Sequence, residues 1–270
     1  MPEAPPLAGV LLGQIRYQAT LLARNPRALY TGFAFPVLLL LVRHAASGHG
    51  VAALVGGVVT FGIVGTAYVT HASGLVAARD RGTLKRLHGA PLPPWCYFAG
   101  RITATVGLAA IGAAVTVAIA AGTAGVHLSA AAVVSLALAV LACAVCWAAV
   151  GSAMAAFIPN AEAALPMLML TYLPVMFASG ALFTYSGEPA WLADVASWLP
   201  ASPASDAIGG ALSATAVRFP VRDVLLLAGW AALGLVVAVA RFRFEPPPPK
   251  AGRRIGHTGS HELATKPTTQ

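Results

Sequence analysis

Long apolar stretches separated by short polar segments dominate the hydropathy pattern of the chain. A membrane-spanning helix needs about 20 mostly apolar residues, because each residue rises about 1.5 Å and the hydrocarbon core of a bilayer is about 30 Å thick. Six stretches meet or nearly meet this length: residues 29–46, 51–76, 102–125, 128–158, 163–183 and 224–240. The pattern therefore predicts an all-α integral membrane protein with six transmembrane helices. In the first stretch, Arg43 must extend to the headgroups if the helix is to span.

The segment before the first span has the periodicity of an amphipathic helix. Leu11, Ile15 and Leu22 recur at helical spacing, whereas Gln18 takes another face. The pair Asn25-Pro26 ends this helix, because proline cannot continue the helical hydrogen bonds. We expect residues 1–27 to form a cytoplasmic N-terminus whose helix lies along the inner membrane interface, as an elbow before the first span.

The connection between the fifth and sixth spans is about forty residues long, yet much of it is apolar. Trp191, Val195 and Trp198 recur at helical spacing, and Pro200 and Pro203 interrupt the segment. Tryptophan prefers the headgroup level of a membrane. We expect one or two short helices on the outer side that either dip into the leaflet or lie on it, and an ordinary interfacial loop with aromatic anchors explains the pattern equally well.

The composition excludes a soluble domain. Of the 270 residues, 58% are apolar and only 10% are charged, with a mean hydropathy of +0.76, whereas a soluble domain is about half apolar and about a quarter charged. The net charge of +8 would suggest nucleic acid in a soluble chain, but here it indicates membrane orientation and no nucleic-acid partner is expected. Cys96, Cys143 and Cys146 are too few for a disulfide framework and are interpreted as small apolar helix residues.

Basic residues concentrate on one side of the predicted spans. Fourteen of the seventeen Lys and Arg fall in the N-terminal segment, the connection between the second and third spans, which ends at Arg101, and the C-terminal tail. The positive-inside rule places these segments in the cytoplasm, as an even number of spans requires for the two termini. We therefore expect a transmembrane domain over residues 28–244 and a disordered cytoplasmic tail over 245–270, where four prolines precede a polar, basic sequence.

No motif in the sequence supplies catalysis, metal binding or nucleotide binding. The patterns G-x-x-x-x-G-K-[ST], H-E-x-x-H and zinc-spaced Cys/His are absent, so we expect no cofactor, metal ion or ATPase site in this chain. Midplane charges typical of ion-coupled transporters are also missing. His71 lies on a polar stripe that either lines a cavity or packs by hydrogen bonding, Glu162 fits a short cytoplasmic turn, and Ser179 with His71 only formally resembles a protease pair.

The most specific pattern is the connection between the second and third spans. A short helix is predicted there, with Leu84 and Leu87 on one side, and Gly89 and Pro91 end it. Held between two spans, this helix would project into the cytoplasm, and its apolar side would contact a groove in a partner protein. The alternative is a positively charged loop that only fixes the membrane orientation.

The run from Arg79 to Leu87, followed by Pro91, resembles the signature E-R-E-x-G-T-L-x-x-L…P of the membrane subunits of type-2 ABC exporters, a family that includes antibiotic-resistance permeases of the daunorubicin-exporter kind. Ala78 stands where the signature has its first Glu. The resemblance covers nearly the whole chain, because the elbow helix, the six spans and the outer Trp-rich segment follow the family order. It implies that the outer segment is a re-entrant pair that caps the pathway. It also implies a coupling helix that docks on an ATPase subunit through Arg79, Asp80, Arg81, Gly82, Thr83, Leu84, Lys85, Arg86, Leu87 and Pro91.

The same resemblance implies a permease function. Two six-span units, identical copies or paralogues, would form the path across a bacterial plasma membrane, and two separate ATPase subunits that bind ATP and Mg²⁺ would drive export. The lack of fixed charge in the spans favours a hydrophobic or amphipathic cargo such as a drug, an antibiotic or a lipid-like molecule. The candidate pathway residues, which simple packing would also explain, are Phe61, Tyr68, His71, Tyr172, Met176, Phe177, Ser179 and Phe183. A membrane-embedded enzyme, a non-transporting assembly subunit and a secondary transporter are the alternatives.

Overall fold

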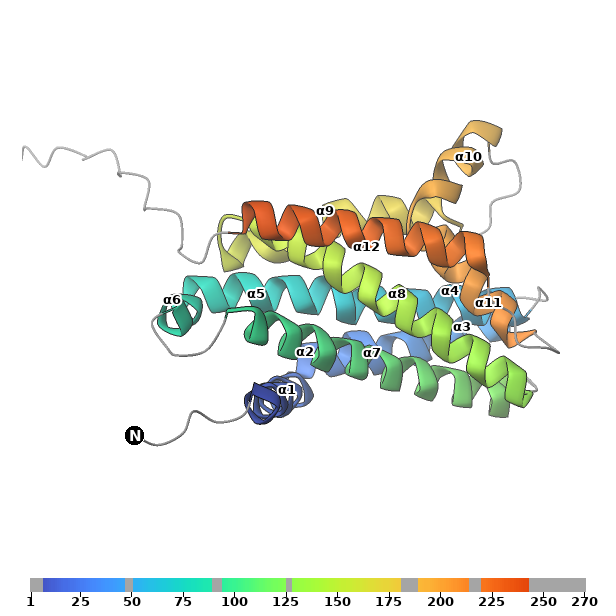
Figure 1. The fold of residues 1–270 in the computed structure, drawn as a ribbon. Coiled ribbons are helices and arrows are strands. Elements are labelled where there is room, and N and C mark those ends of the chain that lie inside the picture. The colour runs from blue at the N-terminus through green and yellow to red at the C-terminus, as the bar shows by residue number, and fades with distance from the viewer. Residues whose placement is uncertain are drawn as a thin grey trace, which may run out of the picture.

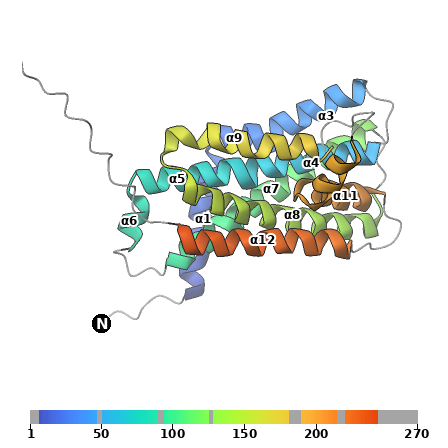
Figure 2. The same cartoon turned by 90° about the horizontal axis from the view of Figure 1, so that it is seen from above.

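The computed structural model describes residues 7–46, 51–88, 94–124, 128–180, 189–213 and 220–242. All regular secondary structure in these ranges is helical, and most of the helices run side by side along one axis, as Figure 1 and Figure 2 show. We call the end of the bundle that holds α6 the α6 end, and the opposite end the α10 end. The elements, with π-helical turns written η, are α1 (Leu7–Ala23), α2 (Pro26–Leu29), η1 (Tyr30–Ala34), α3 (Phe35–Ala46), α4 (Val51–Val64), η2 (Gly65–Thr70), α5 (His71–Asp80), α6 (Thr83–His88), α7 (Pro94–Ala124), α8 (Ala130–Phe157), α9 (Ala161–Ala178), α10 (Ala190–Trp198), α11 (Ala201–Leu212) and α12 (Val221–Arg241).

Five helical stretches are long and apolar enough to cross a membrane: residues 52–80, 95–123, 130–157, 161–178 and 221–241. They correspond to the predicted second to sixth spans. The predicted first span, residues 29–46, corresponds to the continuous helical run of α2, η1 and α3, which meets the same criterion only together with α1. The prediction of an all-α integral membrane protein is confirmed, with five spans by length and composition and a sixth when this bent pair is counted.

Helix α1 has the position expected of the elbow helix. It is bent by 78° from the helix that follows, and Figure 2 shows it crossing the direction of the bundle at the α6 end. One side packs on α7 and buries Gln18 and Leu22, while Leu12 and Tyr17 remain exposed. Helix α1 ends at Ala23, just before the pair Asn25-Pro26 that was predicted to end it. Asn25 then caps the start of α2, because its side-chain oxygen accepts the backbone N–H of Arg27 at 3.1 Å.

Two π-helical turns, η1 and η2, lie next to each other in the first and second helical runs. Small residues permit the close approach. A Cβ at Gly32 would come 2.7 Å from the Thr66 hydroxyl, and a Cβ at Gly112 of α7 would overlap the Gly32 carbonyl oxygen. Three helices therefore meet here at backbone distance, where a larger side chain has no room.

The connection between α9 and α12 contains two helices, as one of the predicted arrangements requires. Helix α11 is rich in Ala, Ser, Gly and Pro, and it is buried against α4, α8 and α12. Helix α10 projects beyond the other helices (Figure 1) and exposes Trp191 and Trp198. The Trp230 Nε1–H of α12 donates to the Trp198 carbonyl at 2.9 Å, which ties the end of α10 to the bundle.

Candidate functional site

The predicted coupling helix is α6, which lies crosswise to the spans at one end of the bundle (Figure 1 and Figure 2). Gly82, at a φ of 68°, ends α5 in the left-handed conformation that glycine adopts without strain, and α6 begins at the next residue. Arg81, Thr83 and Arg86 are exposed. Among the other predicted docking residues, the side chains of Lys85 and Leu87 are outside what the structure describes, as is the whole of Pro91.

The prediction that Leu84 faces a partner protein is wrong. Its side chain is 1% exposed and belongs to the chain's own hydrophobic core. The physical reason is the turn at Gly82, which folds α6 back across the end of α5, so that an apolar side chain in the first turn of α6 meets the bundle. The exposed side chains that the structure describes in α6 are those of Thr83 and Arg86.

Arg79 also takes a position that differs from the prediction of a docking surface. Arg79 is 3% exposed, and its guanidinium donates to the carbonyl oxygens of Ala155 at 3.2 Å, Ile158 at 2.5 Å and Pro159 at 3.2 Å. Asp80 Oδ2 accepts the backbone N–H of Ala161 at 2.6 Å. Arg79 therefore binds the connection between α8 and α9 instead of pointing outward, whereas Asp80 binds the first residue of α9 and remains exposed.

Arg101 is a further correction, because it is not one of the exposed loop bases that the charge pattern predicted. Helix α7 begins at Pro94, a residue suited to the first helical turn, so Arg101 lies inside the helix and is 6% exposed. Its guanidinium donates to Gln18 Oε1 of α1 at 3.3 Å and to the His71 carbonyl of α5 at 3.2 Å. It thereby ties the elbow helix to the second and third spans. Pro94, as a helix-start residue, was the sequence signal for this position.

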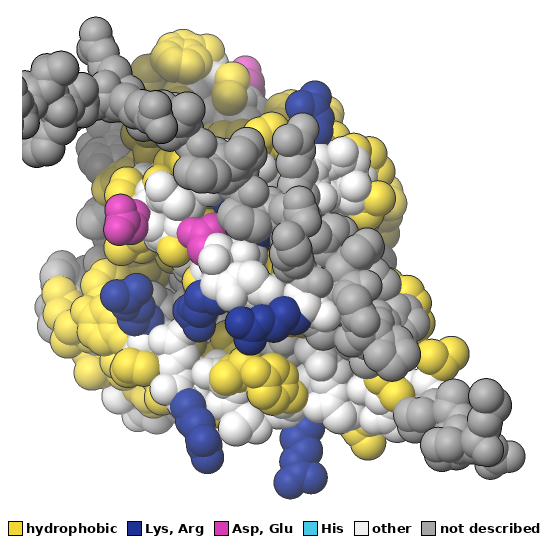
Figure 3. Space-filling model, turned by 90° about the vertical axis from the view of Figure 1, so that its left-hand side faces the viewer, with side chains coloured by type: hydrophobic (Ala, Val, Ile, Leu, Met, Phe, Trp, Pro, Cys, Tyr) yellow, Lys and Arg dark blue, Asp and Glu magenta, His cyan; other side chains and the backbone are white. Residues whose placement is uncertain are grey.

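Exposed arginines gather at the α6 end. Figure 3 looks onto this end and shows dark-blue side chains spread over it. The exposed arginines of the helices that begin or end here are Arg16, Arg24, Arg27, Arg81, Arg86 and Arg241. Glu162 is exposed, but it lies in the first helical turn of α9 and not in the connecting turn where it was expected. The α6 end therefore presents a mainly basic surface built from α1, α2, α6 and α12.

His71 packs by hydrogen bonding. It is fully buried, with Nε2 at 2.9 Å from Ser152 Oγ and Nδ1 at 3.2 Å from Thr105 Oγ1. The Ser152 hydroxyl donates to the Ala148 carbonyl at 2.8 Å, so His71 Nε2 carries the proton and Nδ1 accepts from Thr105. Both ring nitrogens are satisfied within the chain. Ser179 lies at the far end of α9 and does not meet His71, which excludes the formal protease pair.

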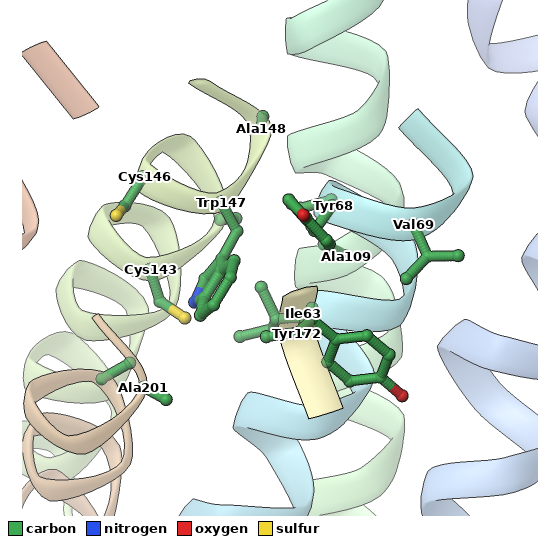
Figure 4. Close-up of a cluster of buried hydrophobic side chains, with 14 of the residues drawn as sticks. Ile63, Tyr68, Val69, Ala109, Cys143, Cys146, Trp147, Ala148, Tyr172 and Ala201 are labelled. Atoms are coloured by element: carbon green, nitrogen blue, oxygen red, sulfur yellow. The ribbon is translucent and has the colours of Figure 1, made fainter. Parts of the chain in front are cut away.

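The aromatic pathway candidates come together in a row of rings across the bundle. Ring centroids are separated by 5.3 Å between Phe35 and Phe61, 5.9 Å between Phe61 and Tyr172, 6.4 Å between Tyr172 and Tyr68, and 5.5 Å between Tyr68 and Trp147. Figure 4 shows the Tyr68, Trp147 and Tyr172 part of this row, with rings from η2, α8 and α9. The row runs from buried Trp147 to half-buried Phe61 and Phe35.

The remaining pathway candidates lie along α9. Met176 is fully buried, Phe177 is 43% exposed, and Ser179 is half-buried at the end of the helix, whereas Phe183 is outside the described residues. The Tyr68 hydroxyl reaches α9 as well, at 2.6 Å from Thr171 Oγ1. One side of α9 therefore faces the core, and the opposite side is largely exposed. Tyr172 and Met176 lie on the buried side, whereas Phe177 lies on the exposed side.

A small polar cavity of about 180 Å³ opens at the α10 end, between the end of α9 and helices α10 to α12. Ser179, Asp206, Arg222 and Asp223 are among its lining residues. Partial burial, together with the nearby Asp223 carboxylate, raises the pKa of Asp206, and Arg222 opposes this shift. In the part of the chain that the structure describes, no group of three or more His, Cys, Asp or Glu could hold a metal ion.

Comparison with known protein families shows which family the chain resembles. The model of the ABC-2 type transporter family matches residues 14–212, from the middle of α1 to the end of α11. The chain belongs to the ABC-2 type transporter family. As an ABC-2 membrane domain it is a permease component, a membrane protein that is not itself the catalytic part of the transporter. A comparison with curated proteins gave no match.

Proposed function

We propose that this ABC-2 permease is the transmembrane subunit of an ATP-driven exporter. Two cytoplasmic ATPase subunits bind ATP and Mg²⁺, dock on the α6 end and drive transport through a path formed with a second permease, identical or paralogous. The complex resides in a bacterial plasma membrane with both termini of this chain in the cytoplasm. The cargo is hydrophobic or amphipathic, as in exporters of the daunorubicin kind.

The observation that carries this proposal is the architecture of the α6 end. Helices α1 and α6 lie across the spans at the same end (Figure 2), and their exposed arginines form a basic surface. A surface of one sign favours association with a partner of opposite charge. Helix α6 also follows α5 directly, so that a partner bound there acts on a membrane-spanning helix.

The nature of the spans supports an apolar cargo. In the described part of the five long helices, charged residues lie near the helix ends, and the two buried ones, Arg79 and Arg101, are already hydrogen-bonded within the chain. No fixed charge is left near the middle of these helices to bind an ion. Phe61 and Phe177 are instead partly exposed, as ligands with apolar and aromatic surface require.

The test is reconstitution with an ATPase subunit encoded beside this chain. The two proteins are co-expressed, purified together and placed in lipid vesicles, and ATP-dependent accumulation of a panel of amphipathic dyes and drugs is measured. The complex should transport at least one of them, and a partner with its phosphate-loop lysine replaced should transport none. Turnover of ATP by the isolated permease, or transport driven by an ion gradient without ATP, would refute the proposal.

A matched pair of variants tests the docking surface. Arg86→Glu reverses a charge on the exposed side of α6, whereas Arg222→Glu makes the same change at the α10 end, and both side chains are exposed. We expect Arg86→Glu to reduce co-purification of the ATPase by about tenfold, since like charges at an interface are unfavourable. Arg222→Glu should leave co-purification unchanged. Equal effects of the two variants would place the docking surface elsewhere.

A further inference from the structure

Arg79 fastens the end of α5 to the end of α8. The last carbonyl groups of a helix have no partner within it, and the Arg79 guanidinium supplies donors to Ala155, Ile158 and Pro159 around the end of α8. A positive charge at this position also interacts favourably with the helix dipole. Such carbonyls at a membrane surface are ordinarily satisfied by water. Water alone would satisfy these carbonyl groups, so the buried arginine suggests a function beyond capping the helix.

Asp80, the next residue, fastens the same point to the start of α9. Its carboxylate accepts the backbone N–H of Ala161, the first residue of α9, at 2.6 Å. Asn160 caps the following turn, with its side-chain oxygen accepting the Ala163 N–H at 2.9 Å. The second Asp80 oxygen lies 3.8 Å from Arg79 Nε. Two consecutive residues of α5 thus hold the end of one span and the beginning of the next.

Arg79 and Asp80 lie close enough to α6 in the chain to move with it. Arg79 and Asp80 are the last two residues of α5, and only Arg81 and Gly82 separate them from α6. Leu84 anchors the first turn of α6 in the core. A displacement of α6 is therefore transmitted through this short connection to the α8–α9 turn, in addition to α5 itself.

Helix α9 is a span with few neighbours that would hold it in place. Among the long helices it is one of the two least buried, with 22% of its most apolar window buried, and it packs mainly on α5, η2 and α10. It also carries Tyr172, Met176 and Phe177 and is followed by Ser179, and these four are the pathway candidates in the described part of the second half of the chain. A lateral or tilting motion of α9 would alter the surroundings of all four.

We propose that Arg79 and Asp80 act as a clamp that passes movement of α6 to α9, and that they are positioning residues for coupling ATP hydrolysis to transport. This inference rests on the proposed function. The clamp residues do not touch cargo or nucleotide. Their role is to keep α6 and the α8–α9 turn moving as one body.

The experiment uses the reconstituted complex and compares Asp80→Ala, Asp80→Asn and Glu162→Ala. Asp80→Ala removes the acceptor for the Ala161 N–H, whereas the amide oxygen of Asp80→Asn can still accept it. Glu162→Ala is the matched control, because it removes an exposed carboxylate from the first turn of α9 that has no part in the clamp. Assembly, ATP hydrolysis and cargo transported per ATP are measured for each.

We expect Asp80→Ala to assemble with the ATPase and hydrolyse ATP at close to the normal rate, but to transport about tenfold less cargo per ATP. Asp80→Asn and Glu162→Ala should remain close to wild type. A merely structural role would lower the amount of complex without changing the ratio of transport to hydrolysis. Wild-type transport per ATP in Asp80→Ala would overturn the clamp while leaving the proposed function intact, whereas failure of the unaltered complex to transport would refute the proposed function itself.

Variants of Arg79 form the second part of the experiment. Arg79→Lys keeps the charge but provides a single donor group in place of the planar guanidinium, and Arg79→Gln removes the charge. We expect Arg79→Lys to show reduced transport per ATP and Arg79→Gln a larger reduction. If all clamp variants that disturb the contacts fail to assemble, the clamp serves folding alone and the proposal is wrong.

Discussion

The hydroxyl of Thr31 in η1 lies 3.3 Å from the hydroxyl of Thr70 in η2. Each residue belongs to a π-helical turn, and π-helical turns inside α-helices are frequent at functional sites. The hydrogen bond therefore joins the two π-helical turns directly. Helix α7 packs beside them, and its Gly112 faces the carbonyl group of Gly32.

Gly112→Ala should destabilise the protein, because the new methyl group overlaps the Gly32 carbonyl oxygen and forces η1 and α7 apart. Overpacking of this kind costs about 1–3 kcal/mol. Gly107→Ala in the same helix is the control, since a Cβ added at Gly107 would meet nothing from other elements within 4 Å, and alanine has the better helix propensity. Thermal unfolding in lipid nanodiscs measures both. A Gly112→Ala melting temperature equal to that of Gly107→Ala would contradict the close contact.

Gln18→Leu should loosen the elbow helix, because it removes the side-chain acceptor that α1 offers to Arg101. Leaving a buried charged donor unpaired costs about 1–3 kcal/mol or more. Gln18→Glu should be tolerated better, since a carboxylate both accepts the hydrogen bond and neutralises the guanidinium. Limited proteolysis near residue 25 and thermal unfolding report on α1. Equal behaviour of the two variants would show that Gln18 does not hold Arg101.

The spans could be predicted from sequence because a run of about 20 apolar residues has few alternatives to a membrane helix. The start of α7 was missed by eight residues, since the charge of Arg101 interrupts the apolar run although the helix continues through it. Its partners, Gln18 and the His71 carbonyl, come from two other helices. Periodicity within one segment holds no information about such partners.

The candidate coupling region shows the same limit. The motif correctly located a short helix after the second span, but it suggested that Arg79 and Leu84 belong to a docking surface. Arg79 instead donates hydrogen bonds to three carbonyl groups some 80 residues later in the chain, and Leu84 packs in the hydrophobic core. Which side of α6 is outward depends on how far the turn at Gly82 rotates it, and residue type alone does not determine that rotation.

Leu84→Asp should prevent stable folding instead of selectively blocking a partner. Its side chain is buried in the chain's own core, and burying an unpaired carboxylate costs several kcal/mol even when its pKa shifts to reduce the charge. Leu84→Met preserves volume and should cost less than about 1.5 kcal/mol. The yield of monodisperse protein in detergent distinguishes them. Normal yield of Leu84→Asp together with loss of the ATPase would show that this side of α6 faces outward.

The membrane orientation can be tested with cysteine labelling, because the native thiols provide a silent background. Cys96, Cys143 and Cys146 are all buried, so even Cys96, beside the basic connection, should resist a membrane-impermeant maleimide in the folded protein. Thr83 on α6 and Ser213 after α11 are exposed at opposite ends of the bundle. Replacing either of them with cysteine introduces one accessible thiol.

The positive-inside rule orients a membrane protein by the Lys and Arg of its short connections, and the exposed arginines of α1, α2, α6 and α12 lie at the α6 end. Thr83→Cys should therefore react with the impermeant reagent only in inside-out vesicles, and Ser213→Cys only in intact cells or right-side-out vesicles. Unaltered protein should react in neither preparation. Labelling of Thr83→Cys from outside intact cells would invert the topology, and the α6 end would then be out of reach of a cytoplasmic ATPase.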